Sequence, residues 1–480
     1  MVAEVKTLQS QNSEIERMEQ LFRLQREAFA RQPYPSAEDR LNQMAKVKDM
    51  LLGHVDEICD AINKDFGNRS ADETKMMEII TSLEGVKYNS KHVRKWMKPE
   101  ARSIGAMQWP ARAWVSQQPL GVVGIIAPWN YPLYLAMGPL LAALAAGNRV
   151  MIKMSEFTPH IGSLLQTMLA KYFTEDQVAV INGEADVAAA FSGLAFDHLL
   201  FTGSTNVGRH VMRAAANNLT PVTLELGGKS PTIISEKFPM ADAASRIAFG
   251  KCFNAGQTCV ATDYILCPEH RVEELIDALR AQVSEMYPTI LNNPDYTSVV
   301  NDRQYARLQK VLADAREKGA RIVEINPANE DLSGSRKIPL TLVMNTRDDM
   351  LIAQEEIFGP LMPVVPYKSL EGALRYVNER PRPLALYYFD YNDANSRHVI
   401  NNTHSGGVSL NDTISHVGVD DMGFGGVGPS GMGRYHGKEG FLTFSNPKSV
   451  LRKGKINFTK SSLPPFGRGI HNLLYKLMLK

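Results

Sequence analysis

The chain has 480 residues, of which 44% are hydrophobic and 22% are charged, and its formal net charge is +2. This composition is typical of a globular protein of roughly three domains with enough apolar side chains for a large core. It excludes a protein that binds nucleic acid through its overall charge, and the sequence lacks the run of about 18 apolar residues that a transmembrane helix needs.

The chain contains four cysteines, namely Cys59, Cys252, Cys259 and Cys267. Four are too few for a disulfide scaffold in a chain of this size, and their spacing matches no zinc signature. The first twenty residues are polar and carry acidic side chains, unlike a signal peptide. We therefore expect a cytoplasmic protein with no metal site.

The N-terminal region, residues 13–66, has the apolar spacing of helices interrupted at Pro33–Pro35. Ser13 and Glu16 have the spacing of a capping box, which predicts a helix start there. From residue 121 the pattern changes to an alternation of apolar strands and helices. The predicted strands are residues 121–127, 150–154, 178–181 and 198–203, and the predicted helices cover 133–146, a segment opened by Thr158–Pro159, and 205–217.

This alternation predicts a doubly wound α/β sheet, with Gly147 ending one helix. Such folds bind ligands at the carboxyl ends of their strands. Asn130, Lys153 and the loop Gly203–Gly208 follow predicted strands and are expected at that edge. A second α/β unit is predicted over residues 228–400, with helices near 269–287 and 302–319, and glycine dominates after residue 405.

The last segment, residues 446–480, carries eight lysines and arginines and no acidic residue. One interpretation is a solvated arm that packs on a neighbouring subunit. The alternative is weak attachment to an anionic membrane surface through the apolar and basic sequence LLYKLMLK.

Three residues could carry chemistry. Cys259, in NAGQTCVA, is a candidate nucleophile, although free cysteines are more often buried core residues and Cys252 competes with it. Glu225, in VTLELGGK, alternates with leucines and could act as a general base, or it could form a salt bridge with Lys229. Asn130, in PWNYP, could donate a hydrogen bond to an oxyanion, or it could merely form a turn. Cys267 lies in YILCP, which is typical of a strand core.

Further segments could bind a nucleotide. The glycines of GSTNVG, residues 203–208, precede a predicted helix, and a helix N-terminus can accept a phosphate. Lys153 and Glu156 follow a strand and could bind ribose hydroxyls, or they could form a solvated turn. Each of these patterns is weak by itself.

Taken together, PWNYP, IKMSE, FTGSTNVG, LELGGK, GQTC, EEIFGP and SLND resemble the aldehyde dehydrogenase superfamily in order and approximate spacing over residues 110–445. The resemblance implies an α/β fold with a Rossmann-like cofactor domain, a catalytic domain and a small β oligomerisation arm. It implies these boundaries: cofactor domain 1–97 and 121–225, catalytic domain 226–402, arm 98–120 and 403–445, and basic tail 446–480.

The resemblance also implies residue roles. Cys259 corresponds to the nucleophile, Glu225 to the general base and Asn130 to the oxyanion donor, with Asn411 near the active site. The residues implied to bind the cofactor are Lys153, Glu156, Gly203, Ser204, Val207, Gly208, Glu356 and Phe358.

Within the superfamily the ending GVGPSGMGRYHGKEGFLTFS is similar to the class 3 branch, and there to bacterial coniferyl aldehyde dehydrogenases. This implies a bulky hydrophobic or aromatic aldehyde substrate, a homodimer, and NAD as cofactor with NADP possible. One departure is Gly423, where the branch usually has proline, and it predicts a looser turn near the substrate entrance.

Three alternatives stay open. The first is an oxidase of long aliphatic aldehydes that lies on a membrane through its tail. The second is a protein that kept the fold and lost catalysis, which an intact set of Cys259, Glu225 and Asn130 disfavours. The third is a phosphate-requiring semialdehyde dehydrogenase, which Glu225 disfavours. Glu225 also distinguishes the chain from the coenzyme-A-acylating members of the superfamily, which lack this base.

Overall fold

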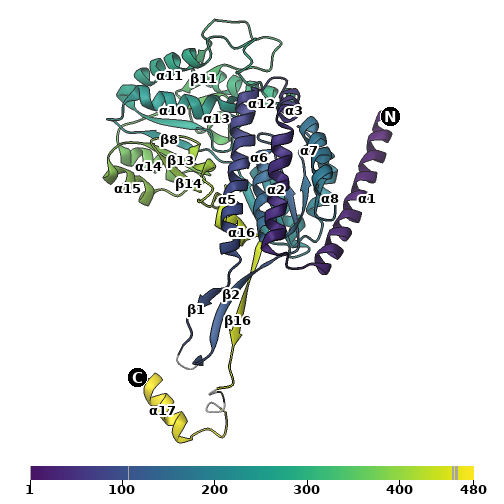
Figure 1. Ribbon diagram of the computed structural model, residues 1–480. Coiled ribbons are helices and arrows are strands. Elements are labelled where there is room, and N and C mark those ends of the chain that lie inside the picture. The colour runs from purple at the N-terminus through teal and green to yellow at the C-terminus, as the bar shows by residue number, and fades with distance from the viewer. Residues whose placement is uncertain (1, 106–107, 457–458, 460–462, 480) are drawn as a thin grey trace.

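The computed structural model describes residues 2–105, 108–456, 459 and 463–479, and Figure 1 shows a body of two α/β units from which a narrow arm projects. The first unit is built on a six-stranded sheet in the order β15-β7-β6-β3-β4-β5. All its neighbouring strands are parallel except β15 and β7. Its strands are β3 (Val122–Ile126), β4 (Arg149–Lys153), β5 (Val178–Ile181), β6 (His198–Gly203), β7 (Val222–Leu226) and β15 (Gly431–Met432).

Helices cover both faces of this sheet, which confirms the predicted doubly wound arrangement. Because side chains alternate along a strand, Val123 and Ile125 of β3 join one core and Val122 and Ile126 join another. The first core includes residues of α2 (Ala37–Gly53), α3 (Val55–Phe66), α5 (Thr81–Trp96), α6 (Tyr134–Ala146) and α7 (Pro159–Tyr172). The second includes residues of α1 (Val2–Arg31), α8 (Ala185–Ser192) and α9 (Thr205–Ala216).

The helix starts differ from the prediction at two places. Ser13 lies inside α1, so the predicted capping box there is wrong, because the helix extends well before it. The capping box belongs to Ser36 at the start of α2: its Oγ accepts from the Asp39 backbone at 3.1 Å, and the Asp39 carboxylate accepts from the Ser36 backbone at 2.9 Å. The interruption at Pro33–Pro35 is confirmed.

Helix α7 begins at Pro159, as predicted, but the Thr158 side chain does not cap it. The carboxylate of Asp65 on α3 accepts from the backbone N–H groups of His160 and Ile161, each at 2.9 Å. The cap is therefore supplied by a neighbouring helix. At the end of α6, Gly147 has a φ of 92° and forms the predicted left-handed C-cap.

The second unit contains a seven-stranded sheet in the order β10-β11-β12-β9-β8-β13-β14, in which only β10 runs antiparallel to its neighbour. Its strands are β8 (Pro231–Ile234), β9 (Tyr264–Pro268), β10 (Arg321–Ile325), β11 (Leu340–Met344), β12 (Leu361–Tyr367), β13 (Ala385–Phe389) and β14 (Gly407–Leu410). Its longer helices are α10 (Met240–Cys252), α11 (Val272–Met286), α12 (Asp302–Glu317), α14 (Leu370–Asn378) and α15 (Asp393–Asn402).

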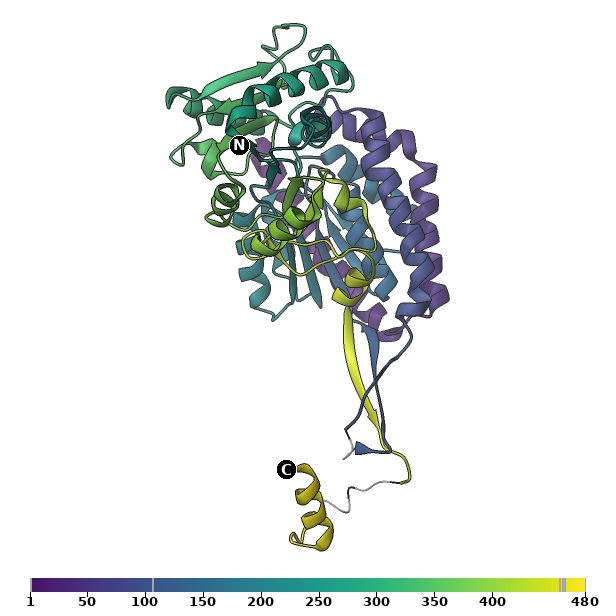
Figure 2. The same cartoon turned by 90° about the vertical axis from the view of Figure 1, so that its left-hand side faces the viewer.

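The arm is a three-stranded antiparallel sheet of β1 (Glu100–Arg102), β2 (Arg112–Pro119) and β16 (Ser445–Arg452). Figures 1 and 2 show it projecting from the body, with α17 (Gly469–Met478) at its far end. Along β16 the register runs from Ser445 opposite Pro119 to Arg452 opposite Arg112. No helix in the described part of the chain is long and apolar enough to cross a membrane.

The boundaries predicted for the arm need correction. Of residues 403–445 only Ser445 belongs to it, because β14 pairs with β13 in the seven-stranded sheet and β15 pairs with β7 in the six-stranded sheet. The third arm strand instead comes from the segment predicted as a basic tail. Glycine explains the placement of β15: a Cβ on Gly431 would lie 2.3 Å from the carbonyl oxygen of Leu224 on β7.

Candidate active site

A cavity of about 680 Å³ opens between the two units. Of the predicted site residues it is lined by Cys259, Glu225, Asn130, Lys153, Glu156, Gly203, Ser204, Val207, Glu356 and Phe358. The carboxyl ends of several parallel strands of the first unit and loops of the second unit therefore supply one site. Residues that are 200 positions apart in the chain meet there, as the doubly wound fold predicts.

Two predicted residues lie outside the cavity lining. Gly208 packs against β7, where an added Cβ would lie 2.6 Å from Leu226 Cδ2, so its small size serves helix packing. Asn411 is not among the lining residues, and its side-chain oxygen accepts from the Asp390 backbone N–H at 2.8 Å. Its carbonyl accepts from Arg246 at 2.6 Å. The hydrogen bonds of Asn411 therefore connect it to Asp390 and Arg246 rather than to a lining residue of the cavity.

Cys259 follows a short 3-10 helix, η3 (Phe253–Gly256), in which Asn254 and Ala255 have φ values of 49° and 50°. The side chain of Gln257 holds this tight loop. Its Nε2 donates to the carbonyl oxygens of Asn254 at 3.0 Å and Ser298 at 3.1 Å, and its Oε1 accepts from the Val300 backbone at 3.0 Å. The backbone N–H groups of Cys259 and Val260 lie near the sulfur and act to lower the pKa of the thiol.

Burial raises the pKa of the Cys259 thiol to about 12, and the neighbouring carboxylates of Glu356 and Glu225 act in the same direction. Burial also raises the pKa of Cys252 and of Cys267 to about 12. Acidity thus does not distinguish the three cysteines. Position does, because Cys259 lines the cavity, whereas Cys267 lies within β9 as predicted and Cys252 ends α10.

Glu225 lies on β7 and points into the cavity. Burial raises the pKa of its carboxyl group well above the ordinary value, and the positive charge of Arg434 opposes this only in part. The alternative of a salt bridge with Lys229 is wrong. The Lys229 ammonium binds the carboxylate of Asp263 and donates to the carbonyl oxygens of Ile352 and Glu355, each at 2.9 Å.

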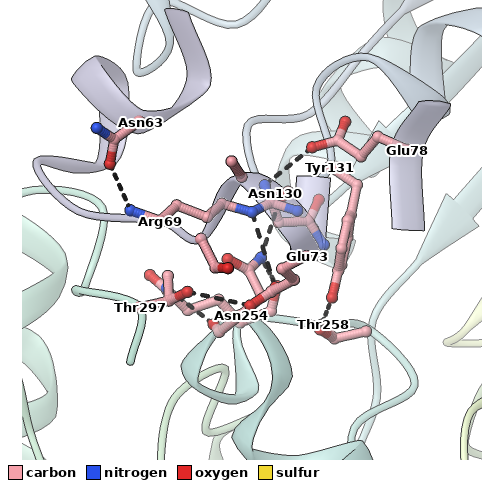
Figure 3. Close-up of polar contacts among 12 residues, drawn as sticks. Asn63, Arg69, Glu73, Glu78, Asn130, Tyr131, Asn254, Thr258 and Thr297 are labelled. Atoms are coloured by element: carbon pink, nitrogen blue, oxygen red, sulfur yellow. Dashed lines mark hydrogen bonds and ion pairs between the residues drawn. The ribbon is translucent and has the colours of Figure 1, made fainter. Parts of the chain in front are cut away.

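Asn130 lies in the short loop between β3 and α6 and is 2% exposed. Its backbone carbonyl accepts two hydrogen bonds, from Arg69 Nη1 at 3.1 Å and from Asn254 Nδ2 at 2.8 Å (Figure 3). The backbone is thus fixed from two sides, while the residue itself lines the cavity. This arrangement leaves its amide for a ligand rather than for the turn.

Another part of the cavity lining suits an anion and a sugar. Ser204 caps α9, its Oγ accepting from the Val207 backbone at 3.4 Å, and the N-terminus of this helix carries a partial positive charge. Lys153 Nζ donates to the carbonyl oxygens of Met154 at 2.6 Å and Gly183 at 2.7 Å. These two bonds orient an ammonium group that has three protons, so one is left for a hydroxyl.

Glu356 lies beside the reactive end. Burial raises the pKa of its carboxyl group to about 8, and its Oε1 is buried with no hydrogen-bond partner among the described residues. Its backbone is braced, because Arg307 donates to the carbonyl oxygens of Glu356 at 3.4 Å and Ile357 at 2.6 Å. Phe358 follows with a φ of 49°, and its ring packs edge-on against Trp129 with centroids 5.2 Å apart.

These groups fit a dinucleotide. A helix N-terminus is available for the pyrophosphate, an oriented ammonium and a carboxylate for one ribose, and for the other a buried carboxylate with one oxygen that has no partner among the described residues. The apolar walls of the cavity supply the surfaces that flat rings need. All the residues predicted from the sequence to bind a cofactor, except Gly208, line this cavity.

The sequence profile of the aldehyde dehydrogenase family matches residues 3–450. The chain belongs to this family. It is 56% identical, over all 480 residues and all of the relative, to the probable coniferyl aldehyde dehydrogenase of Pseudomonas aeruginosa. It is 48% identical to the coniferyl aldehyde dehydrogenase of Pseudomonas sp. strain HR199, covering 94% of each chain. It is 39% identical to mouse aldehyde dehydrogenase family 3 member A2, covering 86% of this chain and 84% of that one.

Solved structures agree with the fold of this aldehyde dehydrogenase. The substrate-bound aldehyde dehydrogenase AldH of Staphylococcus aureus is 37% identical with a TM-score of 0.91, covering 96% of this chain and 99% of that one. The Mycobacterium tuberculosis aldehyde dehydrogenase, which was crystallised in complex with NAD+, is 30% identical with a TM-score of 0.82. It covers 90% of this chain and 89% of its own.

The sequence reasoning missed several residues of the site. Leu135, Phe424 and Tyr435 line the cavity as apolar wall residues, although none of them was a candidate site residue from the sequence. Arg69, Glu73 and Glu78 support Asn130 from behind, but in the sequence they belong to a polar stretch that resembles solvated helix surface. The supporting role of these residues becomes visible only from their burial. Burial at such positions follows from tertiary packing and not from the local pattern of the sequence.

Proposed function

We propose that this aldehyde dehydrogenase oxidises a hydrophobic or aromatic aldehyde, with coniferaldehyde as the first choice, to the carboxylic acid, using NAD. The observation that carries the proposal is the meeting of Cys259, Glu225 and Asn130 at one apolar-walled cavity. The substrate choice is supported by the relatives named coniferyl aldehyde dehydrogenase, which match over at least 94% of the chain.

Cys259, Asn130 and Glu225 each have a separate role in this reaction. The sulfur of Cys259 adds to the aldehyde carbon, and the thiol proton leaves to solvent or to a nearby carboxylate. The oxyanion that develops is held by the Asn130 amide and the Cys259 backbone N–H, an interaction worth about 3 kcal/mol of barrier. Bound NAD supplies the hydride acceptor. Glu225 then takes a proton from water, which attacks the thioester carbon, so that the C–S bond breaks and the acid leaves.

The choice of NAD over NADP follows from charge. Glu156 lines the cavity at the end where Lys153 is oriented for a ribose. A carboxylate directed at that ribose repels the 2′-phosphate of NADP, so we expect NAD to be preferred and NADP to be used with a higher KM. Glu156→Gln is expected to reduce the difference between the KM for NADP and the KM for NAD.

The experiment follows the reduced cofactor by its absorbance at about 340 nm with coniferaldehyde and NAD. Wild type is expected to turn over, and Cys259→Ala to be inactive. Cys267→Ala, which removes a thiol buried in β9, is the matched control and is expected to keep its activity. If no aldehyde tested led to reduction of NAD, the proposed function would be refuted. Activity with benzaldehyde alone would refute only the choice of coniferaldehyde.

A long-chain aliphatic aldehyde oxidase at a membrane surface is a second candidate, and α17 is the observation that favours it. Apolar side chains of and next to this helix are exposed, among them Leu473, Leu477 and Leu479, which are 53%, 67% and 79% exposed, and Lys476 lies between them. Such a surface suits an anionic bilayer. A strong preference for decanal in kcat/KM, with salt-sensitive sedimentation on anionic vesicles, would favour this candidate over coniferaldehyde.

The homodimer stays a prediction from the resemblance. The arm is the element we expect to mediate it, since its outer strands β1 and β16 leave their edges without a partner strand in the described sheet. Analytical ultracentrifugation of the full chain would measure it, and a monomeric species at micromolar concentration would rule it out.

A further inference from the structure

A buried ionic cluster lies directly behind the candidate oxyanion donor (Figure 3). It consists of Arg69, of Glu73 on α4 (Ala71–Thr74) and of Glu78 on the π-helix η1 (Lys75–Ile80). Their side chains are 0%, 6% and 0% exposed. Arg69 Nη1 lies 2.9 Å from a carboxylate oxygen of Glu78, and Arg69 Nε lies 3.7 Å from one of Glu73.

Such a cluster is not explained by stability. Burying ion pairs costs desolvation, and apolar side chains of the same volume often stabilise a core as well or better. The cluster also carries two carboxylates for one guanidinium, and burial raises the pKa of both carboxyl groups while Arg69 opposes that rise. A role in positioning the active-site loops explains the cluster better, because each of its members binds backbone or side chains next to the reacting groups.

On one side the cluster holds the segment that carries Asn130. Arg69 Nη1 donates to the Asn130 carbonyl at 3.1 Å, and the Arg69 guanidinium lies over the Tyr131 ring, 4.8 Å from its centroid. A carboxylate oxygen of Glu78 accepts from the backbone N–H groups of Leu133 at 2.7 Å and Tyr134 at 3.1 Å. The cluster therefore contacts the segment from Asn130 to the first residue of α6 at four positions.

On the other side the same elements hold the loop that carries Cys259. Glu73 accepts from Thr297 Oγ1 at 3.1 Å and from the backbone of Asn254. The Asn254 amide donates to the Asn130 carbonyl at 2.8 Å, so that carbonyl joins both loops. A second link joins the Tyr131 hydroxyl and Thr258 Oγ1 at 3.1 Å, one residue before the nucleophile.

We propose that Arg69, held by Glu73 and Glu78, is a positioning residue that sets the Asn130 amide relative to the Cys259 thiol. The proposal rests on the proposed function, because it takes Asn130 as the oxyanion donor. Arg69 touches neither substrate nor cofactor in this scheme. It acts on the step in which the oxyanion forms, and not on cofactor binding, whose residues lie on other elements.

The test uses acylation of Cys259 in the full chain by p-nitrophenyl acetate, without NAD or aldehyde. The sulfur attacks the ester carbonyl, the C–O bond breaks, and nitrophenolate leaves as acetyl-Cys259 forms. Arg69→Lys keeps the charge but lacks the planar fork that serves three partners. We expect the acylation rate constant to fall about tenfold to a hundredfold, as displacements near 1 Å do, with the Kd for NAD unchanged.

A double-mutant cycle with Asn130→Ala tests whether Arg69 acts through Asn130. If it does, Arg69→Lys adds little to the loss that Asn130→Ala causes alone, so the two effects do not multiply. Effects that multiply in the double variant would overturn the proposal. So would an unchanged acylation rate in Arg69→Lys.

Arg40 provides the matched control for stability. Its guanidinium is also fully buried and donates to backbone carbonyls, those of Pro35 at 3.2 Å and Ala145 at 2.9 Å, the latter at the far end of α6. Arg40→Lys and Arg69→Lys are both expected to lower Tm, and only the latter to slow acylation. If both variants slowed acylation equally, Arg69 would have only a structural role and the proposal would be overturned.

A second variant covers the case in which Arg69→Lys does not fold. Glu78→Gln keeps an acceptor for Leu133 and Tyr134 but removes the charge that binds Arg69. In a double-mutant cycle with Asn130→Ala, we expect Glu78→Gln to add little to the loss of acylation rate that Asn130→Ala causes alone. If the two losses multiply, the proposal is overturned. Failure of wild type to acylate would refute Cys259 as nucleophile and this proposal with it, whereas acylation without aldehyde oxidation would refute the proposed function alone.

Discussion

Glu225 on β7 lies opposite Gly431 on β15, and neither carboxylate oxygen of Glu225 has a hydrogen-bond partner among the described residues. The antiparallel strand β15 thus covers the edge of the sheet without supplying a side chain that could bind this carboxylate. A buried acid without partners is costly to ionise, which is the electrostatic condition for a strong base that becomes active only when water or substrate is present.

Replacing this base separates the two halves of the reaction. With Glu225→Gln, we expect one equivalent of reduced cofactor per site to form at the wild-type rate, followed by turnover slowed by about 10²–10⁴-fold. The thioester on Cys259 should then be visible as a mass increase of the intact protein. A variant that turns over normally, with no added mass, would show that another group activates water.

The hydrolytic step should depend on pH in one direction. Glu225 must lose its proton to act as a base, and burial raises the pKa of its carboxyl group well above 4.5. Hydrolysis of acetyl-Cys259 is therefore expected to accelerate as pH rises through the neutral range, rather than to level off near pH 5. Measured from pH 5 to 9, Glu225→Gln should give a flat profile over the same range. Equal slopes in both proteins would contradict the assignment.

The same carboxyl group should lower the stability of the fold as pH rises. The folded chain keeps the proton at pH values where the unfolded chain has lost it, so the folded state binds more protons and its stability falls above about pH 4.5. Glu225→Gln does not titrate. Its Tm should exceed that of wild type by about 2 °C or more at pH 8, a difference that shrinks toward pH 4. A constant difference across pH would mean that packing, not charge, separates the two proteins.

Gly227 should be required for cofactor affinity. A Cβ added there would lie 1.9 Å from a carboxylate oxygen of Glu356, which is closer than any contact allows. Gly227→Ala is expected to push Glu356 from its place and raise the KM for NAD about tenfold or more, as the loss of about 1.4 kcal/mol implies. Gly454→Ala, with nothing within 4 Å of the added Cβ, is the matched control. An unchanged KM would show that Glu356 does not bind the cofactor.

The sequence predicts those parts of the fold whose cause is local. The run GVVGIIA predicts a strand buried on both faces, and β3 is buried at all five positions. Gly147 predicts a helix end because a left-handed residue is needed there. The cap of α7 could not be predicted, since its carboxylate comes from Asp65, nearly a hundred residues earlier.

For the site, the motifs place most of the residues that line the cavity, but they do not show what holds them. The SLND motif suggests Asn411 at the active site, whereas its side chain binds the Asp390 backbone. Arg69 and Glu78, in contrast, could not be predicted as part of the site. Their charge predicts that they are exposed, but both are buried. A buried charge is specified by partners distant in the chain, which no periodicity in one sequence encodes.

The pairing of β2 with β16 has a consequence for synthesis on the ribosome. β2 ends at Pro119 and its partner begins at Ser445, so translation must continue for more than 300 residues before the two can meet. At roughly 5–20 residues per second this takes about 15–60 s, during which one edge of β2 is open to strands of other nascent chains. Yield in the cell should therefore depend on chaperone capacity and on temperature during expression, and slow elongation between β2 and β16 should increase aggregation.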